Sequence, residues 1–491
     1  PSRGLGDVYK RQIDREGKPL TRGATTEHTL LNAGFNLLGT SLAAQEYWDN
    51  HRALDYLLTR KDIDPEHIGV YGSSGGGTQT AYYIGLDPRV KVAAICSFFS
   101  TRERTMELQG PSDGCQHIPY EGREQLEVPD FALMMAPRPL LILSGKYDFV
   151  DLWGAQQGFA ELQQCYKVLG VPEKVDMLTV ETGHGLGAEK RQKLASWFKR
   201  WLKDNQSPVK KAAQDRFQLS DMLCTTKGQV NVSMPGALSI MQENVNQLDE
   251  WASKRETFLS KGKKTVQTKM LDLLGLKGLP DHKIRIEATG HDSMREYEQY
   301  KFQLIREGEM PVPCILIMPS RANADSPIEL RLQEEGKGTY LSEYANFAAA
   351  LTEGKILLLA DLRGLGETTD PAFYTDAKYW NREYRNAMIS MHIGRPIMGQ
   401  RVVDILTLLD FCSEHELLKG HPVKVFANGI YGPAVIHAAY LDERINSVEI
   451  THSVKTWKEY IEKPMQWDMY SNVLYGLSLI HISEPTRRSY I

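Results

Sequence analysis

Between positions 13 and 204, segments with apolar residues at helical spacing alternate with short segments that are mostly apolar. LAAQEYWDNHRALDYLLTR (residues 42–60) and QKLASWFKRWLKD (residues 192–204) have apolar positions at helical spacing. Four short apolar runs rich in Leu and β-branched residues lie between these helices: HIGVYG, KVAAICSFF, PLLILSG and KVDMLTVE. Short apolar strands that alternate with amphipathic helices predict a mostly parallel sheet covered by helices on both faces.

Residues 276–476 show the same kind of pattern with other elements. KIRIEA, YKFQLIRE and CILIMP predict strands, and ILLLADLRGLGET predicts a strand that leads into a glycine-rich turn. The intervening residues, 205–275, predict a linker with a short strand pair (FQLSDMLCTT and GQVNVSMP) and two helices. We interpret the KGKK run within it, residues 261–264, as a solvated face.

The chain also contains an internal repeat. A displacement of 355 positions lays residues 38–90 over residues 393–445 without a gap. Gly39 then meets Gly394, Asp55 meets Asp410, and LDPR meets LDER. A period this long does not fit a solenoid, and an unbroken offset through a helix, a loop and a strand predicts two copies of one α/β domain.

Composition narrows the class of protein. The net charge of −4 gives no electrostatic reason to expect a nucleic-acid partner. We expect no membrane span, because no uninterrupted apolar run has the necessary length. The six cysteines are scattered and include no C-x-x-C, which argues against a disulfide scaffold.

The two ends of the sequence can be encoded by opposite strands of one DNA segment. One DNA spelling of PSRGLGDVYKRQ, residues 1–12, has a reverse complement that translates as LSLIHISEPTRR, the sequence of residues 477–488. This pair resembles a transposase-type sequencing adapter. We therefore expect residues 1–12 and 477–491 to be adapter artefact, and residues 13–476 to be a natural segment cut at both ends.

One glycine-rich stretch carries the pattern of a catalytic serine. Gly72-Ser73-Ser74-Gly75-Gly76 fits G-x-S-x-G with Ser74 as nucleophile, and it has the strand before it and the helix after it that the motif requires. Small neighbours are needed because the serine lies on a strained turn. The Gly75 N–H, at the helix N-terminus, is the predicted oxyanion donor. The alternative is a Gly/Ser loop without chemistry.

A nucleophilic serine needs a base and an orienting acid, which follow it in the chain order Asp or Glu, then His. KYDFVD, after the run PLLILSG, offers Asp148 and Asp151. We choose Asp148 because it lies nearer the strand end, whereas Asp151 has the position of a helix N-cap. TGHG, after KVDMLTVE, offers His184 as the base; alone, it would be read as an exposed loop histidine.

Other candidates are weaker. Cys115 and His117 offer two metal ligands, but two do not close a zinc site, and we expect a structural or substrate-facing loop there. His28 lacks a placed partner, and His51 is expected on a helix surface. Trp153 could line a pocket, although a core position is the preferred interpretation.

The strand-to-helix turn that carries Ser74 is a nucleophile elbow, and the repeat contains a second elbow without a nucleophile. Ser74 falls on Gly429, while Gly77 falls on Gly432 and the surrounding apolar pattern is kept. Glycine offers no nucleophile, so this mechanism cannot operate at residue 429. We expect the second copy to be degenerate, retained to pack on the first, to shape its cleft or to bind a polymer.

With these residues placed, the chain resembles the α/β-hydrolase superfamily. More narrowly, it resembles the large acetyl xylan esterase-like proteins of Bacteroidetes, which carry two such domains; the phrase APRPLLI-x-x-G-x-x-D is shared with the prolyl oligopeptidase group. The phrases that carry the likeness are GVYGSSGGGTQTA, DFALMMAPRPLLILSGKYDFVD, TVETGHG and DLRGLGET. The resemblance implies Ser74 as nucleophile, Asp148 as acid, His184 as base, and secreted or periplasmic deacetylation of plant polysaccharide.

We therefore expect two tandem α/β-hydrolase-type domains, both truncated. Residues 13–204 would be the C-terminal part of the catalytic domain, and residues 276–476 the N-terminal part of the degenerate one. The first part lacks the early strands and the loop that would give a second oxyanion N–H. The expected activity is a serine carboxylesterase without cofactor or metal, acting on acetylated polysaccharide. The alternatives are a prolyl oligopeptidase-type peptidase and a non-catalytic polysaccharide-binding protein.

Overall fold

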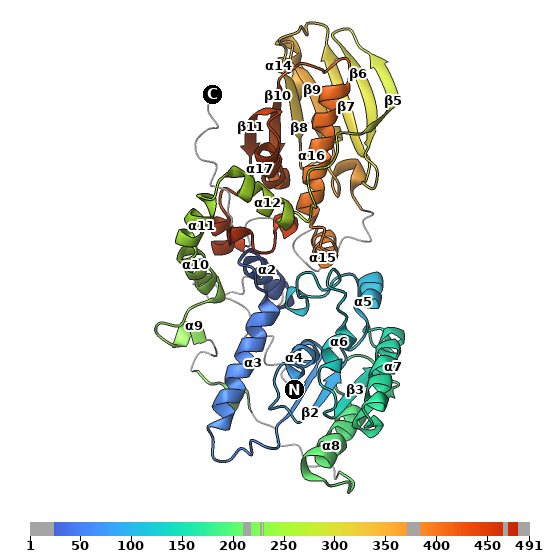
Figure 1. The fold of residues 1–491 in the computed structure, drawn as a ribbon, viewed down its shortest axis with the longest axis vertical. Coiled ribbons are helices and arrows are strands. Elements are labelled where there is room, and N and C mark those ends of the chain that lie inside the picture. The colour runs from blue at the N-terminus through green and yellow to red at the C-terminus, as the bar shows by residue number, and fades with distance from the viewer. Residues whose placement is uncertain are drawn as a thin grey trace. The chain divides into compact units, whose positions relative to one another are not determined.

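The computed structural model describes residues 24–209, 218–225, 228, 230–370, 383–464 and 470–479. The chain divides into two units, residues 1–32 with 41–238, and residues 33–40 with 239–491 (Figure 1). The region expected as a linker, residues 205–275, is thus shared between the units and split after residue 238. Of the two ends expected to be adapter sequence, only residues 477–479 lie within the described ranges.

The first unit contains a four-stranded parallel sheet, which confirms the four predicted strands. The sheet order is β1-β2-β3-β4, and the bounds are β1 Gly69–Ser73, β2 Val92–Cys96, β3 Leu140–Gly145 and β4 Val175–Val180. The helices are α3 Leu42–Leu58, α4 Gly75–Ile84, α5 Arg102–Gln109, α6 Val128–Leu133, α7 Leu152–Val168 and α8 Ala188–Lys203, with 3₁₀ turns η1 Gly114–Gln116 and η2 Pro172–Lys174. Helix α2, Ala24–Leu37, belongs to this unit up to residue 32 and to the second unit from residue 33.

Apolar side chains cover both faces of this sheet. On one face, Ile95 and Ile142 pack with residues of α3, α4, α6 and α7, including Leu162. On the other face, Leu141 packs with Trp197 of α8. The central strands β2 and β3 are buried along their whole length, which explains their continuous apolar runs, whereas the edge strands β1 and β4 are only partly buried.

The second unit contains a seven-stranded mixed sheet in the order β11-β10-β8-β9-β7-β6-β5. Strand β7 is antiparallel to both of its neighbours, and β9, β8, β10 and β11 are parallel. The bounds are β5 Arg285–Ser293, β6 Tyr297–Ile305, β7 Val312–Pro319, β8 Ile328–Leu332, β9 Ile356–Ala360, β10 Val423–Asn428 and β11 Ile445–Thr451.

Helices α14, α16 and α17 contact strands of this sheet, and α16 lies along it in Figure 1. The bounds are α10 Ile240–Glu250, α11 Ala252–Leu259, α12 Lys263–Leu273, α13 Lys337–Leu341, α14 Ala345–Thr352, α15 Tyr384–His392, α16 Ile397–Glu414, α17 Gly432–Leu441 and α18 Trp457–Glu462. The shorter 3₁₀ turns are η4 Gly366–Thr368, η6 Gly429–Tyr431, η8 Tyr470–Asn472 and η9 Leu477–Leu479. Within the described ranges, no helix has the length and apolar character needed to cross a bilayer.

The predicted strand pair between the copies is wrong. Its described residues form a 3₁₀ turn, η3 Leu219–Met222, and a short helix, α9 Val230–Ser233. Gln218 and Asp221 form a reciprocal capping box at the start of η3, so local side chains satisfy backbone groups that a strand partner would otherwise satisfy. Three helices, α10 to α12, follow instead of the two expected.

The structure extends the repeat. At the same offset, α3 corresponds to α16, β1 to β10, α4 to α17 and β2 to β11. Helices α2 and α15 end at equivalent positions, and each is followed by a glycine at positive φ, Gly39 at 75° and Gly394 at 73°. Thr101 caps α5 as Thr456 caps α18. The two copies therefore share one backbone course well beyond the stretch that the sequence aligned.

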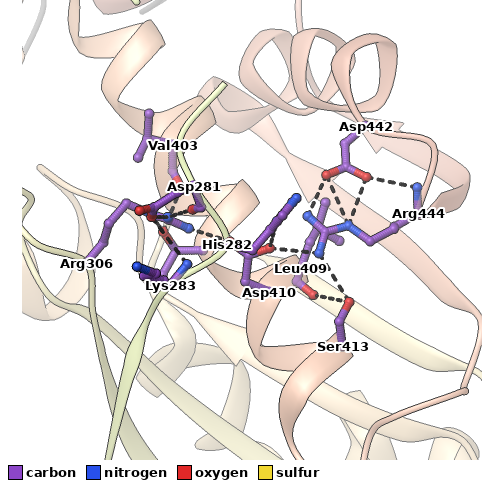
Figure 2. Close-up of polar contacts among 11 residues, drawn as sticks. Asp281, His282, Lys283, Arg306, Val403, Leu409, Asp410, Ser413, Asp442 and Arg444 are labelled. Carbon is purple, nitrogen blue, oxygen red and sulfur yellow. Dashed lines mark hydrogen bonds and ion pairs between the residues drawn. The ribbon is translucent and has the colours of Figure 1, made fainter. Parts of the chain in front are cut away.

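The acidic and basic residues of the repeated motif, LDPR and LDER, form an ion-pair network near the C-terminal ends of α4 and α17. In the first copy, Arg89 bridges Asp87 and Asp55 with N···O distances of 2.6 Å. In the second, Arg444 bridges Asp442 at 2.6 Å and Asp410 at 2.8 Å (Figure 2). Since both networks tie the loop before the next strand to the preceding amphipathic helix, this part of the repeat serves the fold.

Candidate active site

Ser74 lies on a sharp turn between β1 and α4. Its backbone has φ 59° and ψ −124°, a strained conformation for a residue with a side chain. A Cβ at Gly72 would collide with the Gly76 carbonyl oxygen, and one at Gly77 would lie 2.8 Å from the Cys96 carbonyl oxygen. The Ser74 N–H donates to that same Cys96 carbonyl at 3.0 Å. Close backbone approach thus explains Gly72 and Gly77, whereas an added Cβ at Gly75 or Gly76 would meet no heavy atom within 4 Å.

Asp148 and His184 come together at the ends of neighbouring parallel strands. Asp148 follows β3 and His184 follows β4, and these strands pair up to Gly145 and Val180. The Asp148 Oδ1 to His184 Nδ1 distance is 2.6 Å. The other ring nitrogen, His184 Nε2, is buried and has no hydrogen-bond partner among the described residues. The imidazole is therefore held through Nδ1, with Nε2 left for a further group.

Electrostatics keep the acid ionised. Burial by itself would raise the pKa of Asp148, but hydrogen bonds from His184, from the Val150 N–H and from Ser97 outweigh it. The pKa of Asp148 therefore lies below the ordinary value for aspartate. An ionised carboxylate can orient the imidazole and stabilise an imidazolium.

Asp151 occupies the other position that the sequence left open. Its side chain accepts the Gly154 N–H at 2.6 Å as N-cap of α7, and it pairs with Arg104. It contributes to the start of a helix, as the alternative interpretation expected.

Two residues that sequence reasoning missed connect the elbow with the histidine loop. Ser97 directly follows Cys96, the acceptor of the Ser74 N–H, and has φ 50°. Its hydroxyl accepts the Gly185 N–H at 3.1 Å and a bond from Lys190 Nζ at 3.2 Å. Lys190 is 1% exposed and also donates to the Gly185 carbonyl at 3.0 Å. Neither residue belongs to a motif, so only the fold brings them together.

Aromatic side chains flank the same loop. The Phe149 ring stacks on the His184 ring with centroids 4.1 Å apart. Trp153, expected in the core, is instead 55% exposed, and Arg104 lies over its ring. The core interpretation of Trp153 was wrong because α7 begins at the surface and Trp153 is in its first turn.

The second elbow keeps the turn and fills the site. Gly429 has φ 62°, matching Ser74, but a Cβ there would collide with the Glu334 carboxylate. That carboxylate accepts the Ile430 N–H at 3.0 Å, and Ile430 is the counterpart of Gly75. Glu334 therefore occupies the place where a nucleophile and an oxyanion would otherwise lie.

Two of the remaining candidates have other partners. His51 is half-buried on α3 and contacts Asp87 at 3.1 Å. Cys115 contacts His28 rather than His117, with Cys115 Sγ 3.2 Å from His28 Nδ1. Both contacts are between elements distant in sequence, which a single sequence cannot reveal.

Parallel strands, a strained serine elbow and an Asp–His pair at the next two strand ends define the first unit as an α/β-hydrolase-type domain. Residues 38–205 match the prolyl oligopeptidase family. The protein YtaP of Bacillus subtilis, named as a hydrolase, is 26% identical over 168 residues, which are 34% of this chain and 56% of YtaP. The chain thus spans about half the length of that curated relative.

Solved structures give weaker similarities. A methylesterase is 26% identical and covers 36% of this chain and 37% of its own, with a TM-score of 0.28. An acetyl xylan esterase from Thermoanaerobacterium sp. is 14% identical and covers 46% of this chain and 68% of its own, with a TM-score of 0.32.

Proposed function

We propose that the first unit is a serine carboxylesterase with Ser74, His184 and Asp148 as its triad. The observation that carries this proposal is the 2.6 Å contact of Asp148 with His184 Nδ1, together with a serine at φ 59° on the turn between β1 and α4. The match of residues 38–205 to a family of serine hydrolases supports the same chemistry.

In this mechanism, Ser74 Oγ attacks the carbonyl carbon of an acetyl ester while its proton passes to His184 Nε2. Asp148 holds the imidazole through Nδ1 and stabilises its charged form. The tetrahedral intermediate collapses to an acyl-serine as His184 protonates the departing sugar oxygen. Water, deprotonated by His184, then releases acetate and restores the serine hydroxyl.

The Gly75 N–H is proposed to stabilise the developing oxyanion. The second copy supports this role, since the equivalent N–H of Ile430 donates to a carboxylate oxygen of Glu334. The same backbone position thus holds negative charge in the copy that cannot react. In the first copy, Gly75 would offer that N–H to a substrate.

The proposed substrate is acetylated xylan or a related plant polysaccharide, handled outside the cytoplasm. This rests on the resemblance of the elbow, acid and histidine phrases to acetyl xylan esterase-like proteins. A prolyl oligopeptidase-type peptidase is the second candidate, because the matching family carries that name and would use the same triad.

Acetate release from acetylated xylan tests the proposal, with a prolyl peptide substrate assayed beside it. Ser74→Ala should abolish release, whereas Ser73→Ala, which alters the neighbouring hydroxyl in the same turn, should retain most of it. Cleavage of the peptide alone would favour the peptidase. Equal acetate release by Ser74→Ala would show that another residue is the nucleophile.

A further inference from the structure

Three side chains of metal-ligating types, none of them in the proposed triad, meet in the first unit. His28 comes from α2, Glu46 from α3 and Cys115 from η1. His28 Nδ1 lies 3.2 Å from Cys115 Sγ and 3.8 Å from Glu46 Oε1. All three ligand atoms lie within 4.8 Å of one another. Elements far apart in sequence thus present one nitrogen, one sulfur and one oxygen to a common point.

The spacing fits a tetrahedral zinc ion. With Zn–S of about 2.3 Å and Zn–N or Zn–O of about 2.1 Å, tetrahedral ligands lie roughly 3.4–3.6 Å apart. The two measured distances, 3.2 and 3.8 Å, bracket that range. Three ligands leave one position of the tetrahedron for water or another donor.

Burial favours a metal site over a surface cluster. The side chains of His28 and Glu46 are 22% and 16% exposed, and Cys115 is 6% exposed. Thiolate and imidazole ligands favour Zn²⁺ over Mg²⁺ or Ca²⁺, which prefer oxygen.

The second copy has a charged pair at the positions equivalent to His28 and Glu46. At the same offset, His28 corresponds to Glu383 and Glu46 to Arg401. Glu383 and Arg401 form a buried ion pair with each other. The guanidinium supplies the positive charge that joins these helices in the second copy. In the first copy, the equivalent positions carry His28 and Glu46, whose side chains can both ligate a metal ion.

We propose that His28, Glu46 and Cys115 bind one Zn²⁺ ion that joins α2, α3 and the η1 turn. The role is structural, since none of the three residues belongs to the proposed triad. The sequence alone had offered Cys115 with His117 as an incomplete set; the fold replaces His117 with His28 and Glu46. The proposal is independent of the substrate and of the esterase assignment.

Cobalt binding to the full chain tests the site. Protein freed of metal by a chelator should bind one equivalent of Co²⁺, with the near-ultraviolet absorption of a cobalt–thiolate bond, and Zn²⁺ should displace it. Cys115→Ser should remove this band, while Cys165→Ser, a partly buried cysteine on α7, should leave it unchanged. Absence of the band, or its persistence in Cys115→Ser, would overturn the proposal and favour a protonated His28 paired with Glu46.

Two further measurements do not depend on the folding of a cysteine variant. In the unaltered chain, Zn²⁺ should slow alkylation of Cys115 by iodoacetamide, while exposed Cys224 should react at an unchanged rate. Glu46→Gln should weaken Zn²⁺ binding by at least the roughly 10–100-fold that loss of a group supporting a metal ligand costs. Equal alkylation of Cys115 with and without Zn²⁺, or unaltered affinity in Glu46→Gln, would contradict the site.

Discussion

At the scale of single residues, the two copies differ at the reacting atoms and agree in the backbone that holds them. Ser74 and Gly429 share a positive φ of 59° and 62°, and Ser97 and His452 share one of 50° and 51°. The second copy has therefore kept the turn while Glu334 has taken the space above it. Catalysis is proposed for the first copy because only there does the turn carry a hydroxyl.

Lys190 is predicted to position His184, the proposed catalytic base. Lys190→Met keeps the length of the side chain but removes the donor that joins Ser97 Oγ to the Gly185 carbonyl. Small displacements of a catalytic group cost about 100-fold in rate, so kcat should fall by roughly 10–100-fold with little change in KM. Ester hydrolysis kinetics measure both constants.

The matched control for this prediction is Lys193→Met on the same helix. Lys193 is partly exposed and pairs with Asp176 on the strand that precedes the histidine loop. Its kinetics should resemble those of the unaltered chain. An unchanged kcat in Lys190→Met would refute the positioning role.

At the scale of elements, the sequence predicted the strands whose pattern of apolar residues matches their burial in the structure. In the first unit, β2 and β3 are apolar runs buried along their whole length, and the partly buried β1 and β4 were also found. Strand β8 was missed because IELRL alternates with charged residues, although it lies inside the sheet. Glu329 in β8 is 1% exposed and is paired with Arg331 and Lys355, so distant charges make its burial possible.

The site was predictable to a similar extent. Ser74, Asp148 and His184 stand in motifs or directly after predicted strands, so their order along the chain located them. Lys190 and the cluster around Cys115 depend on contacts between elements distant in sequence. A single sequence does not encode such contacts in any local pattern.

The strand-to-helix turn predicts a contrast between two glycines. Gly72→Ala should destabilise the first unit by about 3 kcal/mol or more, because its Cβ collides with the Gly76 carbonyl oxygen. Gly76→Ala should be tolerated, since an added Cβ there has no heavy atom within 4 Å. Thermal unfolding of the two variants distinguishes them, and similar transition temperatures would contradict the geometry of the turn.

At the scale of the whole molecule, duplication explains why each unit carries the same ion-pair network. Hydrogen bonds from Arg89 and Tyr83 outweigh the effect of burial and hold the pKa of Asp87 below its ordinary value. A depressed carboxyl pKa stabilises the fold above the unfolded value of about 3.9. That contribution is lost as the pH falls through the lower, folded pKa.

Asp87→Asn should therefore lower the free energy of unfolding at pH 7 by roughly 2–3 kcal/mol. It should also make the remaining stability of the first unit less dependent on pH below about 4, since one of the linked protons is removed. Urea unfolding at several pH values measures both effects. Asp49→Asn, on the exposed face of α3, should change neither, and an unaltered acid dependence in Asp87→Asn would argue against the network.

The central claim is that Ser74 is a nucleophile activated by His184. Reaction of the full chain with a fluorophosphonate probe, followed by peptide mass mapping, tests it without knowledge of the substrate. We expect a single adduct on Ser74 that is lost in His184→Ala and retained in Ser73→Ala. An adduct on another serine, or labelling of Ser74 that is unchanged in His184→Ala, would contradict it.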